Sequence, residues 1–190
     1  TNAHTDLSDP ALAARVAEIH EHLHHQPDLM CGWVEYPFQV SDEPLNAINH
    51  HAEKVRNKCS VFIVIGIGGS YLGTIAGMQL LVPPFAKTHG IGHPEIIFAG
   101  HHLSSHYYNH LIDIVEDPAE EICICMVSKS GTTTEPKVIY AILKQALMNR
   151  YGEKYNDHIT IITDQDKGAL QLEAESYHIC CLEIPTNIGG

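Results

Sequence analysis

Hydrophobic residues recur along the chain in two patterns, one typical of amphipathic helices and the other of buried strands. Near the start, Asp9 and Pro10 are typical of a helix N-cap and first turn. The apolar residues that follow have spacings of four, three and four: Leu12, Val16, Ile19 and Leu23. The spacing predicts an amphipathic helix. An irregular arm is expected over residues 26–44, which include Trp33, and a second helix over residues 45–58.

From residue 60 onward, short apolar runs alternate with helical windows. The runs predict five strands, at residues 61–65, 95–99, 122–127, 159–163 and 177–182. The windows predict four helices, at residues 70–82, 104–116, 135–150 and 167–175. This alternation favours a doubly wound α/β fold, with a five-stranded parallel sheet flanked by helices. We expect residues 1–58 to form a helical arm packed on a core domain of residues 59–190.

Composition narrows the class of protein. A chain of 190 residues with 44% hydrophobic residues can bury the core of one globular domain. Its formal net charge of −12 repels nucleic acid and anionic membranes. Its apolar runs are far shorter than the roughly 18 residues of a membrane span, and no signal pattern opens the chain. We therefore expect a cytoplasmic protein without nucleic-acid or membrane partners.

Cysteine and histidine are the candidate metal-binding and redox residues. The six cysteines show no CxxC spacing and are expected to be reduced thiols in or near the core. The 15 histidines outnumber the 11 lysines and arginines, so the net charge should change steeply between about pH 7 and pH 5. His102, His106 and His110 are spaced by four and could share a helix face. Without paired cysteine or carboxylate ligands they fit a solvated surface better, and no metal is expected.

The first candidate site follows the strand predicted at residues 61–65. Glycines at 66, 68 and 69 allow close backbone approach to a ligand, and the helix start that they precede favours an anion. Ser70 adds a hydroxyl. A tight turn that needs glycine only for packing is the alternative. A dinucleotide fingerprint would need glycine where Tyr71 stands, and an ATP-binding phosphate loop would need lysine where Thr74 stands.

The second candidate site follows the strand predicted at residues 122–127. Residues 128–134 contain five hydroxyls and one ammonium at the start of a predicted helix, where phosphate oxygens can accept several hydrogen bonds. A capping box of Thr132 and Glu135 is the alternative, but it leaves the other hydroxyls unexplained. Glu135 is the carboxylate of this loop, and a helix-capping role suits it better than that of a catalytic base.

Both loops resemble signature segments of the glucose-6-phosphate isomerase (phosphoglucose isomerase) family in its bacterial form. The segments that carry the resemblance are Val64 to Gly73 and Ser128 to Pro136. Shorter segments are similar too: Gly32-Trp33-Val34, Phe98-Ala99-Gly100 with Ser104-Ser105, Thr163-Asp164 with Lys167 to Leu170, and Ile184-Pro185 with Gly189-Gly190. The resemblance covers nearly the whole chain. It implies the first of two sugar isomerase (SIS) domains in a homodimeric parent protein.

The resemblance implies an aldose-ketose isomerase that interconverts glucose 6-phosphate and fructose 6-phosphate through an enediol, in glycolysis and gluconeogenesis, with no cofactor. The residues that match the family's phosphate-binding groups are Gly69, Ser70, Ser128, Lys129, Ser130, Thr132 and Thr133. Lys129 is expected to act partly through its backbone. Gly189 and Gly190 are expected to border the reacting end of the sugar.

The family's catalytic groups are not matched in this chain. The arginine that follows the Gly-Gly pair, the glutamate base, the ring-opening histidine and the C-terminal lysine have no counterpart, because the sequence ends at Gly190. We therefore expect the 190 residues to bind a sugar phosphate but to be inactive alone. Two other functions stay open: a non-catalytic SIS module that binds a phosphosugar for regulation, and a structural dimerisation domain that retains the loops as turns.

Overall fold

The computed structural model describes residues 8–25, 30–83, 94–166 and 168–189. Its centre is a five-stranded sheet with the order β2-β1-β3-β4-β5, and every pairing is parallel. The strands are β1 (Val61–Ile65), β2 (Glu95–Ala99), β3 (Ile122–Val127), β4 (Ile159–Asp164) and β5 (Cys180–Ile184). The α/β class and the five-stranded parallel sheet expected from the sequence are confirmed. The first three strands have the predicted bounds, because their apolar, β-branched runs are bounded by polar residues, proline or glycine.

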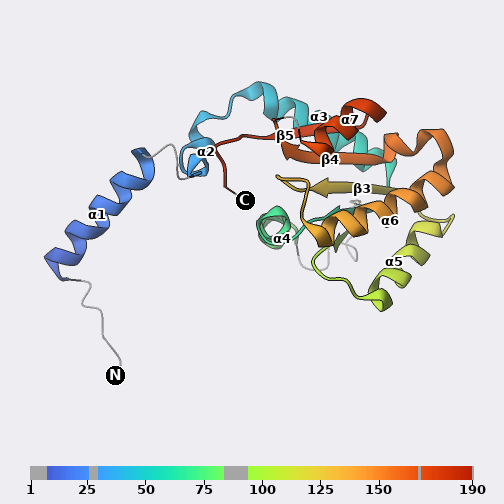
Figure 1. Cartoon of the computed structure of the whole chain (residues 1–190), viewed down its shortest axis with the longest axis horizontal. Helices are drawn as coiled ribbons and strands as arrows, with labels where there is room; N and C mark the ends of the chain where they lie inside the picture. The colour runs from blue at the N-terminus through green and yellow to red at the C-terminus, as the bar shows by residue number, and fades with distance from the viewer. Residues whose placement is uncertain (1–7, 26–29, 84–93, 167, 190) are drawn as a thin grey trace.

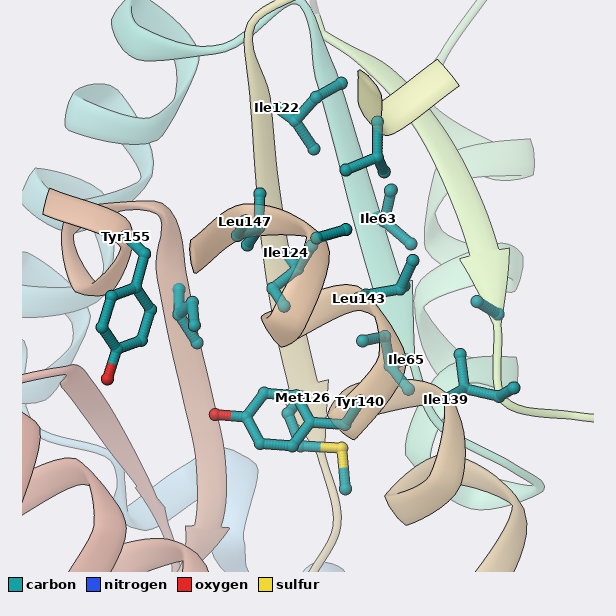
Figure 2. Packing of buried hydrophobic residues seen from close by; sticks show 14 of the residues in the cluster. Ile63, Ile65, Ile122, Ile124, Met126, Ile139, Tyr140, Leu143, Leu147 and Tyr155 are labelled. Carbon is teal, nitrogen blue, oxygen red and sulfur yellow. The ribbon is translucent and has the colours of Figure 1, made fainter. Parts of the chain in front are cut away.

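One face of the sheet carries the hydrophobic core. It is covered by α5 (Ser105–Glu116), α6 (Thr134–Tyr151) and α7 (Ala169–Tyr177), and η3 (Gly152–His158) follows α6 directly. Figure 2 shows Ile63, Ile65 and Ile124 of the sheet packed against Ile139 and Leu143 of α6. These five side chains are almost completely buried, so α6 is fixed on the strands that precede the two candidate loops.

The opposite face is covered by α3 (Asp42–Lys58) and α4 (Gly69–Leu81). Between these helices lies an apolar groove of about 730 Å³, with side chains such as Phe62, Val64 and Met78 on its walls. His51 of α3 reaches the sheet here, since its Nε2 lies 2.8 Å from Oγ1 of Thr160. The groove contains no residue of the two candidate loops.

The N-terminal segment begins with α1 (Pro10–His25), which projects away from the rest of the molecule (Figure 1). Two short helices follow, η2 (Gly32–Val34) and α2 (Tyr36–Gln39), where the sequence predicts an irregular arm. The last described residues run from β5 back to this arm, and Ile188 forms an antiparallel bridge with Cys31. The division into an arm and a core domain stays a prediction.

Some predicted boundaries are wrong. Residues 177–182 are predicted as a strand, but α7 extends to Tyr177 and β5 begins at Cys180. His178 adopts a left-handed conformation with φ of +55°, and its N–H closes the last turn of α7. This helix ending shifts the start of the strand. The second predicted helix also starts earlier, at Asp42, because Asp42 and Glu43 lie in its first turn, where the helix dipole favours acidic residues.

No described helix is both long and apolar enough to cross a membrane. All six cysteines are free thiols: Cys59, Cys123 and Cys125 are buried, and Cys31, Cys180 and Cys181 are half-buried. Burial raises the pKa of the Cys125 thiol to about 12. The predicted position of the cysteines in or near the core is confirmed.

Candidate phosphate-binding site

The two candidate loops leave the sheet from neighbouring strands. β1 and β3 pair in parallel, with Ile65 opposite Met126, so both loops start at the same edge of the sheet. β2 lies outside β1 and β4 lies outside β3, which makes this pair the topological switch point. Ligands of doubly wound sheets bind in the crevice at such a point. The fold thus brings together the two loops that the sequence singles out.

The first loop ends at the start of α4. Gly68 is the N-cap residue with φ of +57°, a conformation that favours glycine, and Gly69 is the first residue of the helix. The Ser70 N–H donates to the carbonyl of Ile67 at 3.2 Å. Ser70 is the second residue of this 13-residue helix, so its hydroxyl lies in the first turn, and its side chain is half-buried. The free N–H groups and the dipole of this helix end favour an anion.

Hydrogen bonds from backbone and side-chain groups to serine hydroxyls of the second loop stabilise its conformation. Ser128 is buried, and its Oγ accepts the Gly131 N–H at 3.1 Å. The Ser130 Oγ accepts both the N–H of Thr132, at 3.2 Å, and its hydroxyl, at 3.0 Å. These bonds hold the loop in a tight turn, in which Gly131 has φ of +66°.

The helix α6 begins directly after this turn. Its N-cap residue is Thr133, not Thr132, and the Thr133 side chain makes no capping hydrogen bond. The alternative interpretation as a capping box of Thr132 and Glu135 is therefore wrong. Since capping does not use the Thr133 hydroxyl, that group can donate to a bound anion. Glu135 lies in the first turn of α6.

Residues outside the loop support it from below. Thr163, which is almost completely buried, donates from Oγ1 to the Ser128 carbonyl at 2.8 Å. A Cβ atom on Gly131 would lie 3.2 Å from Cγ of Leu170, so α7 packs closely under the turn. Neither Thr163 nor Leu170 was predicted as a site residue. The only sequence signal for Thr163 was a polar residue at the end of an apolar run predicted as a strand.

The Lys129 side chain points to the end of the chain. Its Nζ donates to the carbonyl oxygens of Thr186, at 2.9 Å, and Ile188, and lies 3.8 Å from Oδ2 of Asp164. The Gly189 N–H donates to the Met30 carbonyl at 2.8 Å. Gly190 lies outside the described residues. The structure thus joins Lys129 of the second loop to the segment that leads to Gly189.

The end of β2 closes the other side of the first loop. Gly100 has φ of +86°, and a Cβ atom there would lie 3.0 Å from Cγ2 of Ile65 and 3.2 Å from both Gly66 N and Pro136 Cα. Tyr108 accepts the Gly100 N–H at 2.8 Å through its hydroxyl. Gly100 therefore fits between the first loop and the start of α6. The sequence interpretation did not predict this role.

An aromatic cluster lies beside Gly100. The His101 ring stacks on Tyr71 of α4, with 5.5 Å between ring centroids. Burial, assisted by the neighbouring His102, lowers the pKa of His101 below its ordinary value. The neutral form of the His101 imidazole is thus favoured next to the first loop. No sequence pattern predicted that His101 lies there.

The histidines proposed as possible metal ligands do not form one group. α5 begins at Ser105, so His102 lies before the helix and packs against Tyr107, with ring centroids 4.8 Å apart. His106 and His110 contact each other on the helix, with ring centroids 4.7 Å apart. Within the described part of the chain, no group of three or more histidine, cysteine or carboxylate side chains could hold a metal.

Curated relatives of the chain are glucose-6-phosphate isomerases. The protein of Leptospira interrogans is 42% identical over 159 residues, which cover 84% of this chain and 35% of the relative. Those of Alkaliphilus metalliredigens and Staphylococcus saprophyticus are 40% and 39% identical, again over 84% of this chain. The chain thus spans about a third of the length of the relatives it matches. The expected resemblance to bacterial glucose-6-phosphate isomerases is confirmed.

Two solved structures share the fold. A hypothetical protein from Thermus thermophilus superposes with a TM-score of 0.75 at 24% identity, over 95% of this chain and 42% of that one. A glucose-6-phosphate isomerase from Chlamydia trachomatis has a TM-score of 0.61 at 24% identity, over 78% of this chain and 26% of that one. No family model matches the chain.

Proposed function

We propose that this chain is the phosphate-binding part of a glucose-6-phosphate isomerase. In this proposal it is the first of two SIS domains, in a cytoplasmic homodimer that acts in glycolysis and gluconeogenesis. The supporting observation is the position of the two loops. They precede α4 and α6 at the carboxyl ends of adjacent strands, so two helix N-termini lie at the same edge of the sheet, at its topological switch point.

The phosphate of glucose 6-phosphate or fructose 6-phosphate is held between these loops. The backbone N–H of Gly69 and the hydroxyls of Ser70 and Thr133 donate to its oxygens, with further donors from the second loop: Ser128, Lys129 (through its N–H) and Ser130. The Thr132 hydroxyl donates to Ser130 Oγ at 3.0 Å and becomes a donor to the phosphate when it turns away from Ser130. Binding at the phosphate fixes the far end of the sugar relative to the catalytic groups. This part of the protein therefore contributes positioning rather than proton transfer.

Proton transfer between C2 and C1 of the open-chain sugar needs a base, and the enediolate that forms needs a positive charge. We assign these groups to isomerase polypeptide outside the 190 residues. In that case the 190 residues bind the substrate without turning it over. No metal or organic cofactor takes part in the proposed reaction.

Calorimetric titration with fructose 6-phosphate tests the proposal, with fructose and inorganic phosphate as controls and a coupled assay for turnover. We expect fructose 6-phosphate and phosphate to compete for one site, fructose not to bind, and turnover to be absent. Lack of binding by both phosphate ligands would contradict the assignment of the loops. Turnover by the 190 residues would contradict the assignment of the catalytic groups to other polypeptide.

A chimera separates the isomerase from a non-catalytic phosphosugar-binding module. The chimera is the Leptospira interrogans isomerase in which the matched third is replaced by the corresponding residues of this chain. We expect it to interconvert glucose 6-phosphate and fructose 6-phosphate. A folded chimera that binds fructose 6-phosphate without turnover would favour the regulatory module.

A further inference from the structure

The ammonium group of Lys129 is committed to backbone carbonyls. Two of its three N–H donors are used on Thr186 and Ile188, and the Asp164 carboxylate lies 3.8 Å away. The Lys129 side chain is only 18% exposed. Its donors are therefore directed toward the end of the chain, although Lys129 belongs to the loop proposed to bind phosphate.

The segment that Lys129 contacts, residues 185–189, is also hydrogen-bonded to the N-terminal arm. Beyond β5, it is held to the arm by the Asn187 carbonyl, which accepts the Gly32 N–H at 3.0 Å, and by the Gly189 N–H bond to Met30. A Cβ atom on Gly32 would lie 2.4 Å from Nδ2 of Asn187, so the Asn187 side chain packs directly on Gly32. Lys129 joins the same segment to the second loop.

The backbone of Lys129 is fixed independently of its side chain. Its carbonyl accepts the Asp164 N–H at 3.4 Å and the Thr163 hydroxyl at 3.3 Å, at the end of β4. Because its backbone is fixed to β4, the Lys129 ammonium can hold Thr186 and Ile188 at a fixed position relative to the second loop. Loss of the ammonium would leave two carbonyls of the 185–189 segment without their charged donor.

We infer that Lys129 is a positioning residue whose ammonium holds the 185–189 segment beside the second loop, rather than a side-chain ligand of phosphate. This inference rests on the proposed function, in which Gly189 borders the reacting end of the sugar. Lys129 then sets the distance between the phosphate and the segment that closes on the rest of the substrate. A lysine that only neutralised phosphate would make no such connection.

The first test needs no ligand. Amide hydrogen exchange at Gly32 and Gly189 is compared in the wild type, Lys129→Met and Lys137→Met, a control that removes an exposed charge near the same loop. We expect exchange about tenfold faster in Lys129→Met and unchanged in the control. Lys129→Arg keeps donors for the carbonyls and should restore part of the protection. Unchanged exchange at both amides in Lys129→Met would overturn the inference.

The second test compares two ligands. If Lys129 positions the 185–189 segment, Lys129→Met should weaken fructose 6-phosphate more than inorganic phosphate. An equal loss of about tenfold or more for both ligands would mean that the ammonium binds phosphate directly, which overturns the inference. A wild-type chain that binds neither ligand would refute the proposed function, whereas the exchange experiment would still decide whether Lys129 holds the segment.

Discussion

A Cβ atom on Gly66 would lie 3.3 Å from the carbonyl oxygen of Val127. Gly66 directly follows β1 and Val127 is the last residue of β3, so the two candidate loops leave the sheet in contact with each other. The same Cβ would lie 3.1 Å from Cβ of Ser70. The missing side chain at Gly66 thus sets the spacing between the two loops.

Gly66→Ala should separate the loops. Because the added methyl meets backbone and a short side chain that cannot swing away, we expect a loss of about 1–3 kcal/mol in the free energy of unfolding. Phosphate affinity should fall as well. Gly73→Ala is the matched control, since its Cβ would meet nothing within 4 Å on α4. It should be neutral or stabilise the fold by up to about 1 kcal/mol.

Urea denaturation of both variants measures these changes. A Gly66→Ala protein with the wild-type midpoint and the wild-type affinity for phosphate would show that the two loops tolerate a wider spacing.

Replacing Ser70 and Thr133 together by alanine should weaken fructose 6-phosphate binding by roughly 1.5–3 kcal/mol, since each hydroxyl donates a charge-assisted bond in the proposed site. Calorimetry measures the change. Ser176→Ala is the control, because that hydroxyl donates to the Leu172 carbonyl within α7. An unchanged dissociation constant in the double variant would remove both residues from the site.

Thr163→Val tests the support beneath the second loop. Valine keeps the shape of the buried side chain but removes the donor to the Ser128 carbonyl, so we expect a loss of about 1 kcal/mol in the free energy of unfolding. The affinity for phosphate should also fall, since Ser128 begins the loop. Thr163→Ser retains the hydroxyl and should keep more of the affinity. Equal affinities of the valine and serine variants would show that the loop holds its shape without this bond.

His158 makes stability depend on pH. It is buried, it stacks on Tyr151 with ring centroids 3.7 Å apart, and its Nδ1 lies 2.7 Å from the Ile122 carbonyl. Burial lowers the pKa of His158 from its ordinary 6.5, and Lys58 adds to the effect, although the Ile122 carbonyl, Glu121 and Asp157 oppose it. The unfolded chain therefore binds more protons than the folded chain between the two pKa values, so stability is lost as pH falls below about 6.5.

Chemical denaturation between pH 7.5 and pH 5 measures that loss, at about half-unit steps. His158→Phe should flatten the pH dependence, although it also removes the bond to Ile122. His110→Phe makes the same replacement at an exposed histidine on α5 and is the control for the added phenyl ring. A slope of wild-type size in His158→Phe would assign the dependence to other groups, such as His51, whose pKa is also lowered by burial.

Sequence patterns predicted the sheet well because its signal is local. The strands at 61–65, 95–99 and 122–127 are short, mostly apolar runs between polar, proline or glycine residues, and the structure has the same bounds. The strand at Cys180 was placed too early, since nothing in the sequence shows that His178 takes the left-handed conformation that ends α7. That conformation depends on contacts of the folded chain.

The candidate site was predictable only in part. Glycines and hydroxyls that follow strands are visible in the sequence, and the switch point brings the two loops together. The partners of Lys129 at Thr186 and Ile188 lie more than 50 residues along the chain, so no local pattern could reveal them. The same holds for Gly100, whose need for glycine arises from Ile65 and Pro136.

The central claim is that one phosphate binds between the two loops. Backbone amide chemical shifts, followed by NMR during titration with fructose 6-phosphate, test it most directly. We predict that the largest changes fall in two stretches at once, residues 68–71 and residues 128–134, with one shared dissociation constant. Changes confined to one stretch, or centred on the apolar groove between α3 and α4, would contradict the account.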